Sequence, residues 1–187
     1  DISLKKYIIN NSFKLDYRFA EVHNMVIGKK MEKSINSQIQ AEFDSSYLYL
    51  SMATWFEKED LPGCAHWMKK QAEEEWGHGM RFYKYLVSRG GRVILEGLST
   101  PQNEWKSATE IFEHVLGHEE KVTALIYAMA ELAEAEKDFA SQSMLKWFVD
   151  EQVEEEEDAT AILNKFKKLG EIPISLVMLD KELGARA

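Results

Sequence analysis

Glu75 and His78 are the two residues whose types and spacing most directly suggest chemistry. They are three positions apart, so a helix would carry both side chains on one face. A carboxylate and an imidazole placed in this way can bind the same metal ion. A single Glu-x-x-His pair nevertheless occurs by chance in many helices. The pair indicates a metal site only if further ligands lie at the same level of the fold.

Polar residues interrupt four otherwise apolar helical seams. Heptad spacing identifies one seam of apolar or small residues in each of four segments, and the last seam continues to Leu169. The interrupting residues are Glu42, Glu75, Glu119, Gln152 and Glu155. Glu42 and Glu75 are 33 residues apart, and so are Glu119 and Gln152. We therefore interpret the chain as two similar helical hairpins whose polar residues meet in one layer.

A buried layer of bare carboxylates needs something to neutralise it. Desolvation penalises every charge, and like charges at short range add to that penalty. Either protons bind to carboxyl groups of raised pKa, or cations bind among them. His78 favours cations, because one Glu from each of two helices with Glu-x-x-His from the others is the pattern of di-iron bundles. Here Gln152 and Glu155 replace the second Glu-x-x-His, so the predicted site has an imidazole on one iron only.

Prolines and glycines mark the elements that must hold this layer. We predict helices over about 28–58, 64–89, 107–136 and 138–168, and a short fifth helix over 174–183. Ser107 can cap the third helix, with Glu110 at capping-box spacing, and Asp138 can cap the fourth. Residues 92–106 form the one long connection. The predicted fold class is all-α.

Composition limits the class of protein. The 187 residues carry a net charge of −9, the wrong sign for binding nucleic acid over a wide face. No uncharged stretch is long enough to span a membrane. Cys64 is the single cysteine, which excludes a disulfide framework within the chain and a multi-cysteine metal site. No secretory signal pattern opens the sequence, so we expect a cytoplasmic protein without nucleic-acid or membrane partners.

Five runs of residues resemble the non-haem ferritins of bacteria and archaea. They are 40–49, 71–78, 117–120, 147–156 and 179–183, in the family's order and spacing. The resemblance implies a ferritin-like four-helix bundle, with a long crossover between helices two and three and a short fifth C-terminal helix. It also implies a hollow shell of twenty-four chains. On this basis residues 28–184 form a ferritin-like di-iron domain, 1–27 an N-terminal extension of unknown role, and 185–187 a tail.

The resemblance also assigns roles by position. It implies a ferroxidase centre made of Glu42, Glu75, His78, Glu119, Gln152 and Glu155. Tyr49 matches the family's tyrosine beside the di-iron pair, and Trp147 matches its nearby tryptophan. A third, adjacent iron site would use Glu74, Glu151 and Glu154. Trp76 stands where haem-binding relatives have a methionine ligand, so we expect iron without haem.

These assignments predict a ferroxidase and iron-storage protein. Fe(II) and O2 would be its substrates, and ferric mineral would collect inside the shell. One alternative is a ferritin-like peroxidase or other redox enzyme without storage, although such enzymes normally add a Cys-rich segment or a second Glu-x-x-His. Another is a structural four-helix bundle whose acids simply face water.

The remaining polar residues receive structural interpretations. Glu156 and Glu157 belong to a run of acids, and such runs usually face solvent or a cavity. Four histidines outside the motif, namely His23, His66, His114 and His118, are interpreted as surface or packing residues. Cys64, at a helix start, is interpreted as a packing residue.

Overall fold

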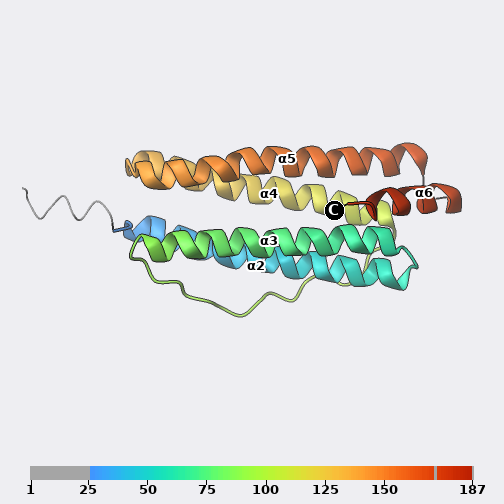
Figure 1. Ribbon diagram of the computed structural model, residues 1–187, viewed down its shortest axis with the longest axis horizontal. Helices are drawn as coiled ribbons and strands as arrows, with labels where there is room; N and C mark the ends of the chain where they lie inside the picture. Colours follow the sequence, from blue (N-terminus) through green and yellow to red (C-terminus); the bar gives the residue numbers. More distant parts are fainter. Residues whose placement is uncertain (1–25, 171, 187) are drawn as a thin grey trace, which may run out of the picture.

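Five helices make up the part of the chain that the structure describes. The computed structural model describes residues 26–170 and 172–186. The helices are α2 (Lys29–Lys58), α3 (Pro62–Ser88), α4 (Ala108–Ala135), α5 (Phe139–Leu169) and α6 (Pro173–Leu183), as shown in Figure 1. The predicted all-α bundle with a short fifth helix is confirmed. Most of the predicted extension, residues 1–25, lies outside the described residues.

Local capping interactions set the helix ends. The Ser107 hydroxyl accepts the Glu110 N–H at the start of α4, and the Asp138 carboxylate accepts the Ser141 N–H at the start of α5. The capping box itself is shifted by one residue, because the Glu110 carboxylate accepts the N–H of Lys106, at 2.5 Å, rather than that of Ser107. α3 begins at Pro62, two residues earlier than predicted, because proline is well suited to the first helical position.

Two antiparallel hairpins pack side by side in the bundle. α2 packs on α3 and α4 packs on α5, while α6 lies mainly against α3. The connection from α3 to α4 runs the whole length of the bundle, so these two helices point the same way (Figure 1). Several side chains of α2 hold this connection by hydrogen bonds, Asn36 and Asp44 among them. Asn36 accepts the N–H of Ile94 at 2.7 Å, and Asp44 accepts the N–H of Ser99 at 2.8 Å.

Apolar side chains fill the two ends of the bundle as separate clusters. One cluster contains the aromatic residues Phe56, Phe112 and Phe166, and the other contains Phe82 and Phe148. The polar residues of the predicted layer fall at or next to the boundary between these clusters in α2, α3, α4 and α5. The fold therefore places the layer near the middle of the bundle, between two close-packed apolar clusters that exclude water.

The fourth seam is shorter than predicted. Phe166 is buried, but the side chain of Leu169 is 44% exposed. α5 ends at Leu169 and Gly170 follows with φ of +69°, so the chain turns away from the bundle at this point. None of the helices in residues 26–170 and 172–186 combines the length and apolar composition that a membrane crossing would need.

Candidate metal centre

The six residues of the predicted layer are all buried. Each of the four long helices contributes at least one of them: Glu42 from α2, Glu75 and His78 from α3, Glu119 from α4, and Gln152 and Glu155 from α5. Glu42 and Glu75 are each 1% exposed, and Glu119 is fully buried. Carboxylates are rarely so buried unless a counter-charge, a proton or a metal accompanies them.

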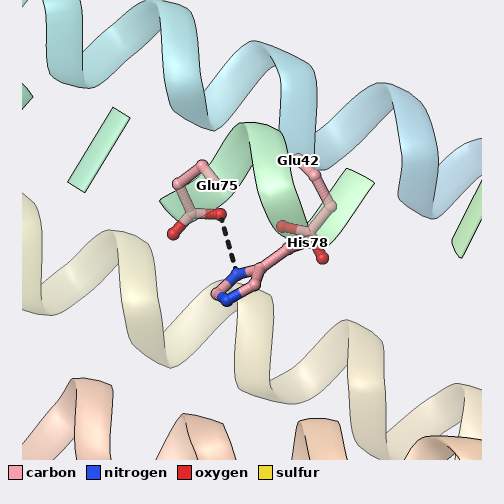
Figure 2. A group of neighbouring side chains, drawn as sticks. All are labelled: Glu42, Glu75 and His78. Carbon is pink, nitrogen blue, oxygen red and sulfur yellow. Dashed lines mark ion pairs between the residues drawn. The ribbon is translucent and has the colours of Figure 1, made fainter. Parts of the chain in front are cut away.

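Glu42, Glu75 and His78 form the most compact group in the layer. One ligand atom from each lies within 4.8 Å of the others. His78 Nδ1 lies 3.6 Å from Glu75 Oε2, as Figure 2 shows. Glu42 Oε2 and Glu75 Oε2 are buried, and neither has a hydrogen-bond partner among the described residues. Two orphaned carboxylate oxygens beside an imidazole nitrogen fit a divalent cation, which would satisfy all three atoms.

A second group shares the same imidazole. One ligand atom each from His78, Glu151 and Glu155 also lies within 4.8 Å of the others. His78 Nε2 is 3.9 Å from Glu151 Oε1, while Nδ1 faces Glu75. The ring therefore stands between the buried carboxylates of α2 and α3 and the acids of α5. Glu151, which the resemblance assigns to an adjacent third site, thus lies directly beside the main layer.

Glu119 and Gln152 are held by each other and by neighbouring hydroxyl groups. The Tyr49 hydroxyl donates to Glu119 Oε1, and the Gln152 amide donates to Glu119 Oε2 at 3.3 Å. The same amide donates to Thr123 Oγ1 at 3.3 Å. Both Glu119 oxygens thus have partners without a metal ion. A cation here would compete with these two hydrogen bonds.

Burial controls the protonation of the layer. It raises the pKa of Glu42 and Glu75 well above the ordinary value, and neighbouring carboxylates raise each further. Burial also raises the pKa of Glu119, against hydrogen bonds from Tyr49 and Gln152 that lower it. For Glu155, burial and the charge of Glu119 raise the pKa to about 7. Without cations the layer therefore binds protons near neutral pH, and cations would displace those protons.

Two aromatic residues that the resemblance associates with the iron pair, Tyr49 and Trp147, lie beside the layer. Tyr49 is fully buried, and burial together with the nearby Glu119 raises its pKa well above the usual value. The Trp147 ring centroid lies 5.5 Å from that of His78, and the Arg81 guanidinium covers the Trp147 ring at 3.8 Å. Both rings are thus within a short distance of the predicted metal ligands.

Of the three residues predicted for the third site, the structure places only Glu151 in a group of possible metal ligands. Glu151 belongs to the group with His78, but Glu154 is exposed and stands outside both groups. Glu74 is paired with Arg186, whose Nη2 lies 2.6 Å from Glu74 Oε2. Of the acids interpreted as facing solvent, Glu156 is half-buried and accepts a hydrogen bond from Thr123 Oγ1 at 2.5 Å.

Two glutamines that sequence reasoning missed support the carboxylates. The Gln38 amide donates to Glu42 Oε1 at 3.0 Å, and the Gln71 amide donates to Glu155 Oε2 at 2.8 Å. Both are nearly completely buried. Spacing could have identified Gln38, which lies one turn before Glu42 on the same helix. The contact of Gln71 joins α3 to α5 and has no signature within either helix.

Of two residues interpreted as packing residues, His118 is half-buried and Cys64 is buried. The His118 ring lies against Tyr49, with centroids 6.0 Å apart, and its Nε2 is 2.8 Å from the Ser45 hydroxyl. Burial lowers the pKa of His118 to about 4, so the ring is neutral near pH 7. Cys64 is 1% exposed, and burial raises the pKa of its thiol, which opposes the reactivity of a thiolate.

The fold and the site together define a four-helix bundle with a carboxylate-rich candidate metal centre. Residues 32–169 match the family described as the ferritin-like domain. A bacterial non-heme ferritin from Bacteroides fragilis (strain 638R) is 44% identical over 161 residues, which cover 86% of this chain and all of that protein. A bacterial non-heme ferritin from Staphylococcus aureus (strain USA300) is 35% identical over 161 residues, 86% of this chain and 97% of that protein.

Comparison with solved structures identifies the same family. An open-pore ferritin from the hyperthermophilic archaeon Archaeoglobus fulgidus is 45% identical, with a TM-score of 0.85 over 86% of this chain and 98% of that one. An engineered closed form of the A. fulgidus ferritin gives the same values. This chain belongs to the ferritin family. Family membership and the buried carboxylate and histidine ligands make it an iron-storage protein with ferroxidase activity.

Proposed function

We propose that this chain oxidises Fe(II) in pairs at the buried layer. Glu42, Glu75 and His78 would hold one ferrous ion, and Glu119, Gln152 and Glu155 would complete the position of a second. Two Fe(II) ions bound close together can give two electrons to one O2 molecule and become Fe(III). The observation that carries this proposal is the pair of orphaned buried oxygens, Glu42 Oε2 and Glu75 Oε2, beside His78.

The chemistry of the donors suits a transient substrate site. Carboxylate oxygens and one imidazole bind Fe(II) without a thiolate, which would hold soft metals more firmly. The same donors favour Fe(III) by charge, so oxidation would proceed with the product still neutralising the layer. Zn(II) uses the same ligand types and should compete with Fe(II) and inhibit.

Tyr49 and Trp147 are the residues that could deliver or stabilise a further electron. The Tyr49 hydroxyl contacts Glu119 directly, and the Trp147 ring lies 5.5 Å from that of His78. Reduction of O2 beyond two electrons needs a donor other than one iron pair. These two side chains lie close enough to the layer to act as electron donors, one on each side of it.

A third iron would bind on the α5 side of the layer. Glu151 already lies with His78 and Glu155, and its partners would be Glu74 and the exposed Glu154. Haem, by contrast, is not part of the proposal. Trp76 stands at the position of the methionine ligand, and its ring stacks on Phe43 with centroids 4.5 Å apart.

Storage would take place inside a shell of 24 chains in the cytoplasm. The exposed apolar side chains on α6, among them Ile174, Val177 and Met178, are each at least 60% exposed. Such a surface on a short helix favours burial against other subunits. Ferric product leaving the layer would then collect in the enclosed cavity as mineral.

Aerobic addition of Fe(II) tests the proposal. The assembled protein should produce ferric absorbance much faster than buffer and retain the iron in a large particle on size-exclusion chromatography. Glu75→Ala and His78→Ala should remove the fast phase, whereas Glu73→Ala, which changes an exposed neighbour, should keep it. A small oligomer that turns over peroxide would favour the redox enzyme instead. No acceleration over buffer would leave only the structural bundle.

A further inference from the structure

Arg186 follows the last residue of the short helix α6 by three positions and packs against α3. Its backbone carbonyl is 2.8 Å from His66 Nε2, and its guanidinium covers the Trp67 ring at 5.0 Å. The guanidinium also donates to Gln71 Oε1 and to Glu74 Oε2, the latter at 2.6 Å. Three side-chain contacts and one backbone contact along one face of α3 fix this residue, whose side chain is only 24% exposed.

The path of the chain brings Arg186 to this place. α6 packs so closely on the start of α3 that an added Cβ on Gly63 would lie 1.8 Å from the Asp180 carbonyl oxygen. The Asp180 carboxylate accepts the N–H of Cys64 at 2.9 Å. With α6 held in this way, the residues that follow it run along α3 toward the metal ligands.

Arg186 contacts the proposed metal centre at two points. One is Glu74, an expected ligand of the third iron. The other is Gln71, whose amide nitrogen donates to Glu155 Oε2 at 2.8 Å while its amide oxygen accepts from Arg186. Because the guanidinium is a donor only, it fixes which end of the Gln71 amide faces Glu155.

We propose that Arg186 is a positioning residue that competes with the third cation for Glu74. The proposal rests on the proposed function, because it takes Glu74 as a ligand of the third iron. A guanidinium keeps its positive charge at any physiological pH. Glu74 Oε2 cannot serve the guanidinium and a metal ion fully at the same time. Arg186 therefore weakens the third site while Gln71 stays oriented toward Glu155.

The competition works in both directions. If Arg186 lowers the affinity of the third cation, that cation must weaken the hold of Arg186 on Glu74 by the same factor. Filling of the third site would thus loosen the segment after α6, while the two ions of the main layer would not. A purely structural role for Arg186, as an anchor for α6, makes the opposite prediction. Its loss would then leave metal binding unchanged or weaken it.

Anaerobic titration of the assembled protein with Co(II) tests the inference, by calorimetry and by the cobalt absorption bands. In Arg186→Ala the third equivalent should bind about threefold to tenfold more tightly, while the first stays within twofold of the unsubstituted protein and the second, whose ligand Glu155 depends on Gln71, binds no more tightly. The affinity of Arg186→Lys for the third equivalent should lie between those of Arg186→Ala and the unsubstituted protein. Lysine keeps the positive charge but cannot donate to Gln71 and Glu74 through two separate nitrogens of a planar group. Lys165→Ala is the matched control, since it removes another ion pair to α6, with Glu182, far from the ligands.

The outcomes are distinct. In a Glu74→Ala background, Arg186→Ala should have no effect on the third equivalent, because the contested ligand is gone. An unchanged or weaker third equivalent in Arg186→Ala, with the first two still bound, would overturn the inference and leave the proposed ferroxidase centre standing. If the unsubstituted protein fails to bind the first two equivalents, the paired-metal assignment fails, and the inference fails with it.

Discussion

Gln71 on α3 donates a hydrogen bond to Glu155 on α5, with Gln71 Nε2 and Glu155 Oε2 2.8 Å apart. The two residues are 84 positions apart in the chain, and both are buried. This bond connects the two hairpins at the level of the predicted metal ligands. It also lowers the pKa of Glu155, against the burial that raises it to about 7.

Gln71→Leu should weaken binding of the second metal ion. Without its donor, Glu155 keeps its proton to higher pH, so a cation must displace a more tightly held proton. We expect the affinity for the second equivalent of Co(II) to fall several-fold at pH 7 and the loss to shrink at pH 8.5. Gln38→Leu is the matched comparison, because Gln38 donates to Glu42 and should affect the first equivalent instead. Equal losses at both pH values would contradict the explanation.

The metal-free protein should lose stability as the pH rises from 6.5 to 8.5. Glu42, Glu75 and Glu155 have raised pKa values in the folded protein, so the native state holds more protons than the unfolded chain in this range. Stability therefore falls with rising pH, by about 1.4 kcal/mol per pH unit for each excess proton. His118 contributes little here, because both its lowered value of about 4 and its ordinary value of 6.5 lie at or below the window.

Thermal unfolding of the metal-free protein at several pH values measures this slope. Glu42→Gln should make the slope shallower, since it removes one of the titrating groups. Saturating Zn(II) should reverse the trend, because its ligands must lose their protons to bind. A metal-free protein whose unfolding temperature rises between pH 6.5 and 8.5 would contradict the assigned directions.

Tyr49→Phe should separate oxidation from binding. The substitution removes the hydroxyl that donates to Glu119 and leaves the ring, which is fully buried, in place. We expect two equivalents of Fe(II) to bind as before, while the rate of ferric product formation falls several-fold over repeated additions. Tyr47→Phe is the control on the same helix, because Tyr47 is 44% exposed and outside the layer. Stopped-flow absorbance measures both, and equal rates in the two variants would exclude a role for Tyr49.

Gly63→Ala should detach α6 from the start of α3. A Cβ at this position would lie 1.8 Å from a backbone oxygen of α6, so one of the two segments must move. We expect faster proteolysis within α6 and a lower unfolding temperature. Gly117→Ala is the control, because a Cβ there meets nothing within 4 Å and alanine favours a helix by up to about 1 kcal/mol. Resistance of α6 to proteolysis in both variants would contradict the close packing.

Much of the fold could be predicted from local signals. The heptad seams, Pro62 and Pro173, and the caps at Ser107 and Asp138 place the helix ends within about two residues of those observed. The heptad pattern wrongly predicted that Leu169 is buried, because the apolar spacing continues past the point where the helix has neighbours to pack against. Periodicity describes one helix and says nothing about where its partner ends.

The gathering of polar residues in one layer could also be predicted, whereas the hydrogen bonds that join segments far apart in the chain could not. Matching intervals between Glu42 and Glu75 and between Glu119 and Gln152 follow from the hairpins themselves. The contacts of Arg186 with Gln71 and of Gln71 with Glu155 join segments that are far apart in the chain. The first depends on how α6 folds back on α3, and the second on how α3 packs beside α5. Such contacts follow from the packing of whole helices, so no single helix pattern reveals them.

Iron-edge anomalous diffraction from crystals soaked anaerobically in Fe(II) tests the central claim most directly. One anomalous peak should appear among Glu42, Glu75 and His78, and a second among Glu119, Gln152 and Glu155. Glu75→Ala should remove the first peak. An iron-soaked crystal without density among these side chains, or with iron bound only at the surface acids, would contradict this claim.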